Sequence, residues 1–298
     1  MLTLVTGASG QLGRSIKSLV KLQNISNSFV FATRDHLDLS YLNNIQSYFK
    51  DRKFDLIINC AAYTKVDKAE LNERQANLIN HLAVKKMAEI AKSRNIKLIH
   101  ISTDFVFDGL KNLPYLETDA TSPLNIYGKT KLAGENAVLS IMKFNAIIIR
   151  TSWVYSEYGN NFVDTILKLV KNGNELNIVA DQIGSPTYAS DLAQTILNII
   201  KNEKFLESGR KSEIYHYSNL GECSWYEFSK EIVNISGVKS TINQINTKDY
   251  PTTAKRPRRT VMSPDKISQE FDLGINFWKD SLKVCMKNLS VISVSNEN

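Results

Sequence analysis

Cysteine is scarce in this chain of 298 residues. The three cysteines, Cys60, Cys223 and Cys285, are odd in number and lie far apart, with no Cys-x-x-Cys pair among them. Disulfide frameworks of small secreted domains and structural zinc sites both need paired or closely spaced cysteines. The sequence therefore excludes both kinds of scaffold.

Long hydrophobic runs are absent as well. No stretch approaches the ~20 apolar residues that a membrane-spanning helix requires. Met1 leads directly into Leu-Thr-Leu-Val, without the charged segment and apolar core of a signal peptide. We expect a cytoplasmic protein with no membrane partner, and the hydrophobic content of 43% is that of an ordinary globular protein.

Acidic residues are in deficit, with 30 Asp and Glu against 37 Lys and Arg and a net charge of +7. Most of the excess is spread along the chain as single lysines on predicted helix faces, so we expect no nucleic-acid partner. The one dense cluster is Lys-Arg-Pro-Arg-Arg at residues 255–259. It favours a local anion site, such as one for the phosphates of a substrate; a solvated surface loop is the alternative.

Short, nearly all-apolar segments alternate with helical patterns in the first half of the chain. Strands that are apolar throughout are typical of a parallel sheet covered by helices on both faces. The pattern predicts an α/β fold with a doubly wound parallel sheet of the Rossmann type. The predicted strands cover residues 2–6, 28–32, 56–59, 97–101 and 145–150, and the predicted helices include residues 11–22, 42–50 and 73–94.

The second half predicts a smaller C-terminal α/β lobe that binds the substrate. Residues 237–265 are polar and contain several prolines, which indicates surface loops. A helix is predicted at 225–235, with Ser224 as its N-cap. We expect a dinucleotide-binding domain at residues 1–155, completed by 187–220, and a substrate-binding lobe at residues 156–186 and 221–290.

The first predicted strand ends in a glycine-rich turn, in which Gly7, Gly10 and Gly13 are spaced three apart. Glycines at this place let the backbone bend sharply and approach a pyrophosphate. The helix that follows, from Gln11 and Leu12 onward, offers free N–H groups to the phosphate charge. We interpret the turn as a dinucleotide site; a purely structural turn is the alternative.

The ends of the second and third predicted strands carry further cofactor candidates. Arg34 favours the 2′-phosphate of NADPH, whereas Asp35 beside it favours the ribose of NADH, so both cofactors stay open. Asp38 and Leu39 follow one short loop later and are expected near the adenine. The segment after the third strand is rich in small residues, which would let a cofactor lie across the strand end or would serve core packing; it contains Ala61, Ala62 and Tyr63.

A proton-transfer pair is predicted by Tyr127 and Lys131, which are four residues apart and so lie on the same side of a helix. A nearby ammonium stabilises a phenolate and would lower the pKa of the tyrosine from ~10. The tyrosine could then donate a proton to a carbonyl oxygen while hydride arrives at the carbon. A hydroxyl from Ser102 or Thr103, at the end of the fourth predicted strand, could hold that same oxygen.

These residues resemble the extended short-chain dehydrogenase/reductase family. They are most similar to the members that reduce the 4-keto group of dTDP-4-keto-6-deoxy sugars with a hydride from NADPH or NADH. The similarity extends over nearly the whole chain. The stretches 66–70 and 150–155 are more specific to these members than the tyrosine-lysine pair. The matching stretches are 10–13, 59–70, 102–109, 123–135, 150–155, 160–162 and 181–187.

The resemblance implies that Thr103, Tyr127 and Lys131 form the catalytic set. It also implies a group of side chains that contact the nucleotide-sugar substrate: Thr103, Asp104, Trp153, Asn161 and Arg256. An aromatic ring can pack on a sugar or a base, and an arginine can pair with a diphosphate. For Trp153, a core aromatic beneath the substrate lobe is the alternative.

The chain departs from the family pattern at two places. Some members form dimers through magnesium held by glutamates, but the corresponding positions here read Gly-Arg-Ser at 13–15 and Ala-Ser-Asp at 189–191. We therefore expect no bound metal, and a monomer or a weak homodimer without a bridging metal. Arg34 stands where some members carry an acid, which leaves the choice of nicotinamide open.

Three other functions compete with a reductase. Dehydratases of the family carry Asp-Glu after the threonine, whereas Phe105 follows Asp104 here, which argues against that activity. A nucleotide-sugar epimerase or a different nucleotide-sugar reductase is an alternative. A non-catalytic regulatory homologue is another, although both Tyr127 and Lys131 are present.

Overall fold

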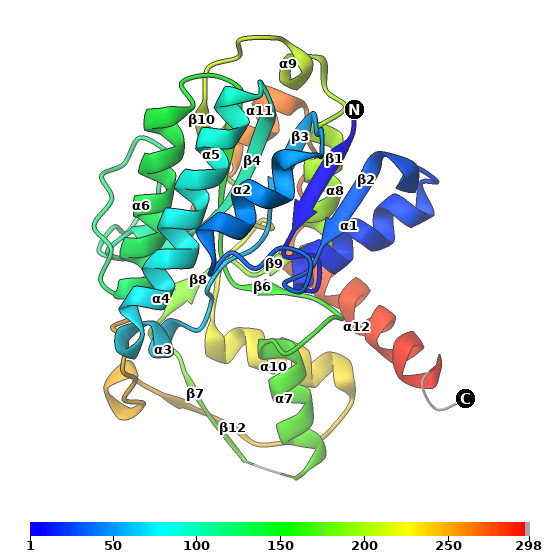
Figure 1. Ribbon diagram of the computed structural model, residues 1–298. Coiled ribbons are helices and arrows are strands. Elements are labelled where there is room, and N and C mark those ends of the chain that lie inside the picture. The colour runs from blue at the N-terminus through cyan, green and yellow to red at the C-terminus, as the bar shows by residue number, and fades with distance from the viewer. Residues whose placement is uncertain (174, 296–298) are drawn as a thin grey trace.

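A parallel sheet of six strands forms the upper part of the molecule in Figure 1. Its order is β2-β1-β3-β4-β5-β10, and all neighbouring strands are parallel. The strand order reverses at β1, which confirms the predicted doubly wound fold and creates the switch point where such folds bind ligands. In the computed structural model, which describes residues 1–173 and 175–295, the strands are β1 Thr3–Thr6, β2 Phe29–Ala32, β3 Leu56–Asn59, β4 Lys97–Thr103, β5 Ala146–Thr151 and β10 Glu213–His216.

Helices cover both faces of this sheet, because its strands are apolar on both sides. The covering helices are α1 Gln11–Leu22, α2 Leu42–Lys50, α5 Ala83–Ser93, α6 Ile126–Ile141, α8 Ala189–Ile199 and α11 Asp265–Phe271. On one face, α1, α8 and α11 bury residues such as Ile16 and Ile196 against the strands. On the other, α2, α5 and α6 bury residues such as Ile45, Met87 and Val138.

The register of the strands brings their carboxyl ends to one edge of the sheet. Thr6 at the end of β1 pairs with Ala32 of β2 and Asn59 of β3, and Thr103 ends β4 beside Thr151 of β5. In Figure 1 this edge faces the lower part of the molecule. Because the predicted cofactor and substrate segments follow these strand ends, the fold gathers them there.

The lower part of Figure 1 is a smaller lobe with its own apolar core. Its main elements are α7 Phe162–Lys171, β7 Leu176–Val179, α10 Trp225–Ser236, β12 Ile242–Ile245 and α12 Trp278–Ser295. Ser224 caps α10 as predicted: its hydroxyl accepts a hydrogen bond from the amide of Glu227, whose carboxylate accepts one from the amide of Ser224. The region 237–265 is not all loop, since β12 pairs with β7 and Ile242 packs against the lobe core.

The helix expected at 73–94 is interrupted. It consists of α4 Glu73–Asn77, a π-helical turn at Leu78–Leu82 and then α5. A π-helical turn inserts an extra residue into the helix and is often found at functional sites. Here it places the side chain of Asn80 toward the interior, where it is fully buried.

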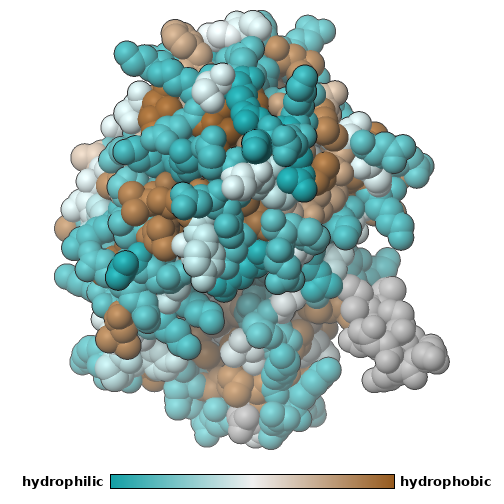
Figure 2. All heavy atoms as spheres, viewed as in Figure 1, coloured by the Kyte–Doolittle hydropathy of each residue, from teal (hydrophilic) through white to brown (hydrophobic). Residues whose placement is uncertain are grey.

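Several short elements complete the fold. They are α3 Val66–Leu71, β6 Val154–Tyr155, β8 Ile183–Gly184, β9 Thr187–Tyr188, α9 Glu203–Leu206 and β11 Cys223–Ser224, with single 3₁₀ turns at Ser26–Ser28, Asp104–Val106 and Thr247–Asp249. β6 pairs with β9, and β8 pairs with β11. The face seen in Figure 2 is mostly hydrophilic, with hydrophobic residues in separate patches. In the part of the chain that the structure describes, no helix has the length and apolar character needed to cross a membrane.

Candidate active site

A cavity of about 860 Å³ lies at the carboxyl edge of the sheet. It reaches from the segment after β2 to the end of β4 and the first turns of α6. Every predicted cofactor residue except Gly13 lines it: Gly7, Gly10, Gln11, Leu12, Arg34, Asp38, Leu39, Ala61, Ala62, Tyr63, Tyr127 and Lys131. Of the predicted substrate residues, the lining includes Thr103, Asp104 and Trp153 but neither Asn161 nor Arg256.

The glycine turn joins β1 to the start of α1. Gly7 has a φ of +65°, and a Cβ there would lie 2.7 Å from the main-chain nitrogen of Ala61, so only glycine fits. Gly10 is the N-cap of α1 and has no side chain to satisfy the first N–H groups of the helix. A Cβ on Gly13 would lie 2.5 Å from the oxygen of Gly7, so this glycine lets the helix pack against the turn instead of lining the cavity. The turn therefore fits a pyrophosphate.

Arg34, which follows β2, places a guanidinium at the end of the cavity where the adenosine of a cofactor is expected. The side chain of Arg34 is 72% exposed, and its Nε lies 3.1 Å from the carboxylate of Asp38. Asp38 also accepts hydrogen bonds from the amide and hydroxyl of Ser40. Partial burial raises the pKa of Asp38, but these bonds and the charge of Arg34 outweigh it and lower the pKa. The exposed side chain of Arg34 could turn toward a phosphate by leaving Asp38, which would keep its hydrogen bonds from Ser40.

The segment after β3 is fixed by an asparagine that the sequence analysis did not single out. The side-chain oxygen of Asn80 accepts a hydrogen bond of 2.8 Å from the amide of Tyr63, and its nitrogen donates to the oxygen of Tyr63 and to Thr130. The π-helical turn supplies this geometry. The sequence signal that could have revealed Asn80 is its position as a polar residue within an apolar helix pattern.

Tyr127 and Lys131 lie on α6, as predicted, one turn apart and both lining the cavity. The helix is capped by Asn125, which accepts a hydrogen bond from the amide of Gly128. The Nζ of Lys131 donates a hydrogen bond of 2.6 Å to the main-chain oxygen of Ile101. Burial lowers the pKa of Lys131 to about 8, although Glu135 opposes this change.

The expected lowering of the tyrosine pKa is not found. Burial raises the pKa of Tyr127 to about 12; a hydrogen bond with Thr103 acts in the opposite direction, and the charge of Asp104 adds to the rise. Desolvation of the phenolate therefore outweighs the favourable effects. The phenol is held in its protonated form.

Ser102 and Thr103, both candidates for holding a substrate oxygen, have different surroundings. The hydroxyl of Ser102 donates a hydrogen bond of 2.5 Å to Glu135, which forms a buried ion pair of 2.7 Å with Arg150. The hydroxyl of Thr103 accepts from the amide of Phe105 and lies beside Tyr127. Of the two, Thr103 is the one placed next to the phenol.

Asp104 connects the end of β4 to the segment before α11. Its carboxylate accepts hydrogen bonds from the hydroxyls of Thr260, at 2.5 Å, and Thr103, at 3.1 Å. Burial raises its pKa to about 6, although these hydrogen bonds oppose the rise. Asp104 therefore lies in the cavity with part of its hydrogen-bonding capacity already used by the protein.

The remaining predicted substrate residues make contacts within the protein. The side chain of Asn161 caps α7 and donates a hydrogen bond to the oxygen of Ser156. Arg256 forms an ion pair of 2.6 Å with Asp67 at the start of α3. Neither faces the cavity, because each side chain is held by these partners.

Trp153 does line the cavity, between β5 and β6. Its φ of +47° is rare for a residue with a side chain and indicates local strain. Its ring stacks on that of Trp225, a residue that the sequence analysis did not select as a site residue. Since the two are far apart in the sequence, no local pattern could have revealed this pair.

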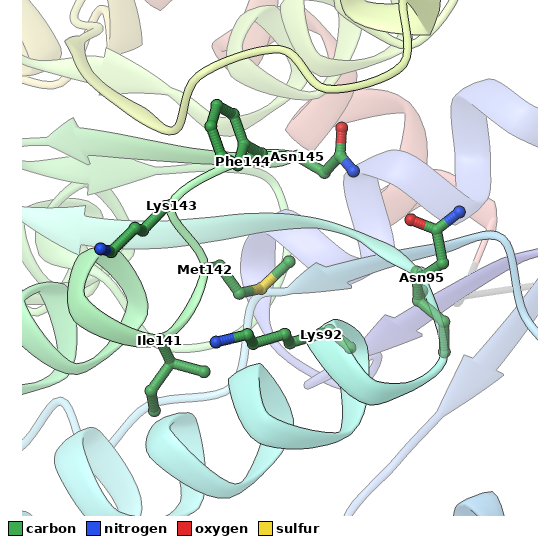
Figure 3. Close-up of a pocket in the computed structure, with 9 residues that line it drawn as sticks. Lys92, Asn95, Ile141, Met142, Lys143, Phe144 and Asn145 are labelled. Carbon is green, nitrogen blue, oxygen red and sulfur yellow. The ribbon is translucent and has the colours of Figure 1, made fainter.

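A second hollow, of about 350 Å³, lies at the amino edge of the sheet (Figure 3). Its lining comes from the ends of α5 and α6 and the turns that follow them, with Lys92 and Lys143 among its side chains. None of the predicted site residues lines it. The larger cavity is therefore the candidate active site.

The sequence matches the family model of the RmlD substrate binding domain over residues 1–291. A dTDP-4-dehydrorhamnose reductase of Aggregatibacter actinomycetemcomitans is 41% identical over 287 residues, which cover 94% of this chain and 96% of that protein. The solved structure of a dTDP-4-dehydrorhamnose reductase from Clostridium acetobutylicum has a TM-score of 0.90 at 36% identity, covering 97% of this chain and 100% of that one. Another, from Bacillus anthracis and in complex with NADP, has a TM-score of 0.89 at 34% identity with the same coverage. The chain therefore belongs to the RmlD substrate binding domain family.

Proposed function

We propose that this chain reduces the 4-keto group of a dTDP-4-keto-6-deoxy sugar with NADPH, converting dTDP-4-dehydrorhamnose to dTDP-L-rhamnose. The names of its relatives support this class of reaction. The observation that carries the proposal is that Thr103, Tyr127 and Lys131 line the same cavity as the glycine turn. A carbonyl placed there would meet a proton donor and a bound cofactor together.

The residues along the cavity fit a nicotinamide dinucleotide. The glycine turn and the start of α1 would hold the pyrophosphate, and Ala61 and Tyr63 would lie along the cofactor. Arg34 would pair with a 2′-phosphate, which favours NADPH over NADH, and the relative solved with NADP supports the same choice. When bound, the cofactor supplies the hydride.

The chain itself would move the proton. Because burial raises the pKa of Tyr127 to about 12, its phenol is protonated at neutral pH, as a proton donor must be. The hydroxyl of Thr103 would hold the substrate oxygen beside it. Lys131, with a pKa of about 8, is mostly charged at pH 7 and would stabilise the phenolate left after transfer.

The nucleotide sugar would lie between the sheet and the smaller lobe, which we assign to residues 156–186 and 221–290 apart from α11, whose residues pack on the sheet. Asp104 and Trp153 line this side of the cavity. Arg256 could reach a diphosphate only by leaving Asp67, so its part in binding depends on exchange of that ion pair.

The assembly and location belong to the same proposal: a cytoplasmic monomer or weak homodimer without a bridging metal. All three cysteines are free, which suits a reducing compartment. Within residues 1–173 and 175–295, no cluster of three or more metal-binding side chains occurs.

The test is a spectrophotometric assay of the purified protein with dTDP-4-keto-6-deoxy sugars. We expect loss of NADPH absorbance that depends on the sugar, together with formation of dTDP-L-rhamnose. Absence of any substrate-dependent oxidation with all such sugars would refute the proposal. Oxidation that yields a different 6-deoxy sugar would keep the reaction class but change the substrate.

A further inference from the structure

The indole rings of Trp153 and Trp225 are stacked face to face at the cavity. Their centroids are 3.4 Å apart and their planes differ by 7°. Both residues line the cavity and both are partly exposed. One face of Trp153 is therefore covered by another ring of the protein.

The opposite face of Trp153 is covered by Gly184 of β8. A Cβ on Gly184 would lie 2.5 Å from Cε2 of Trp153, 2.7 Å from Nε1 and 2.8 Å from Cζ2. Nε1 and Cζ2 are the outer neighbours of Cε2 in the indole. A Cβ in the ring plane beside this edge would be nearer to these two atoms than to Cε2. Because it is nearest to Cε2, the Cβ must lie above the ring plane. Because a stacked ring already fills the other face, the backbone of Gly184 occupies this one.

Only the edge of Trp153 is left for a ligand. The ring lines the cavity, yet both faces are covered, so the part that reaches the cavity is its rim. The hydrogen bonds of the described side chains include none from the indole N–H of Trp153. The expected face-on packing of Trp153 on a sugar or base is not possible in this arrangement.

We propose that Trp225 is a positioning residue of the substrate site, which holds Trp153 edge-on so that its rim and indole N–H meet the nucleotide sugar. The ligand chemistry that fits is a hydrogen-bond acceptor, such as a sugar hydroxyl or a phosphate oxygen. This inference rests on the proposed function, because it assigns the sugar nucleotide to that cavity.

Trp225 is itself firmly held. It is the first residue of α10 and lies between Ser224 and Glu227, the two residues of the capping box. The ring of Phe162, the first residue of α7, lies 4.4 Å from it at a tilt of 51°. Trp225 thus packs against both Trp153 and Phe162, and these contacts hold its ring in place.

Circular dichroism tests the geometry without any turnover. Two stacked indoles couple their transitions and give a paired positive and negative band, which we expect in the wild-type protein and in a Trp278→Phe control. Trp225→Phe and Trp153→Phe should each abolish it. The band should persist when dTDP-L-rhamnose saturates the site; its loss on binding would show that Trp225 moves away, and would overturn the inference.

Calorimetric titration with dTDP-L-rhamnose tests the role in binding. Trp225→Ala should weaken binding about tenfold, the size expected for loss of one well-placed polar contact. Trp225→Phe, which keeps an aromatic cover, should recover most of the affinity, and Tyr226→Ala on the same helix should bind as the wild type does. Unchanged affinity in Trp225→Ala would refute the inference. Binding by the wild type without turnover would refute only the proposed function.

Discussion

The amine of Lys131 is bonded to the main-chain oxygen of Ile101, so the end of β4 holds the cation of α6 in place. This bond fixes the ammonium inside the cavity that Tyr127 also lines. A charge fixed there favours a phenolate whether or not it touches the phenol, because Coulomb interactions act over several ångströms in a buried site. Lys131 and Tyr127 thus line one cavity, and the ammonium is held there by β4.

The pH dependence of turnover should follow the charge of Lys131. Since its pKa is lowered to about 8, the amine is protonated below that pH and neutral above it. We expect kcat/KM to fall as the pH rises above about 8. In Lys131→Arg, whose side chain stays charged, this alkaline fall should disappear even if the rate is lower. An identical alkaline limb in the variant would assign the titration to another group.

Removal of the proton donor should abolish turnover without affecting the cofactor. Tyr127→Phe is expected to lower kcat by roughly 10²- to 10⁴-fold, the usual contribution of a general acid. The affinity for NADPH, measured by fluorescence titration, should change little. Tyr226→Phe is the matched control, and near-normal kcat in Tyr127→Phe would contradict the mechanism.

Arg34 should set the preference between nicotinamides. Arg34→Ala removes an exposed cation and an exposed ion pair, so the fold should be unaffected. We expect about a tenfold higher KM for NADPH, the value of one charge-assisted bond, and little change for NADH. Lys53→Ala, which removes an exposed cation outside the cavity, serves as the control. An equal rise in the KM values for NADPH and NADH would show that Arg34 does not bind the 2′-phosphate.

A methyl group at Gly184 should displace the ring of Trp153 and so disturb the substrate site. Gly184→Ala would place a carbon 2.5 Å from the ring of Trp153, so one of the two must shift. We expect a higher KM for the sugar nucleotide and altered tryptophan fluorescence. At Gly274, by contrast, an added Cβ meets no atom within 4 Å, so Gly274→Ala is the matched control. Unaltered kinetics in Gly184→Ala would show that the ring position is not critical.

Asn161 gives a prediction about stability. Because its side chain caps α7, Asn161→Ala should reduce the free energy of unfolding by about 1 kcal/mol. Asn161→Asp, which retains the accepting oxygen, should restore most of it. The measurement is denaturant unfolding of the three proteins. A large rise in KM with unchanged stability would instead favour the predicted contact of Asn161 with the substrate.

The sequence was most informative where a function depends on residues close together in the chain. The glycine turn and the Tyr127–Lys131 spacing are local patterns, and the apolar strands predicted the order of sheet and helix. Tyr127 and Lys131 accordingly lie on one helix and line the cavity, as expected. The family resemblance, confirmed by the relatives, added Thr103 and Trp153 as candidates, and both line the cavity.

Features that depend on distant residues were missed. Asn80 bonds to Tyr63 only because a π-helical turn rotates it inward, and a helical pattern does not reveal such a turn. The cover of Trp153 by Trp225 and Gly184 requires three separate segments to meet. The pKa of Tyr127 was expected to fall because the spacing shows a charge nearby but does not show how far the surrounding protein removes water from the phenol.

The return of β10 to the sheet has a consequence for synthesis of the protein. β10 pairs with β5 through Tyr215 and Ile149, and α8 packs beside α1, although the chain first passes through α7 and β7. A nascent chain that has emerged only as far as residue 155 has an unpaired β5 edge and an uncovered α1, which invite aggregation. The cofactor half is therefore completed only after the first segment of the lobe, residues 156–186, has been made. A gene fragment ending at residue 155 should require a chaperone or the missing segment supplied in trans.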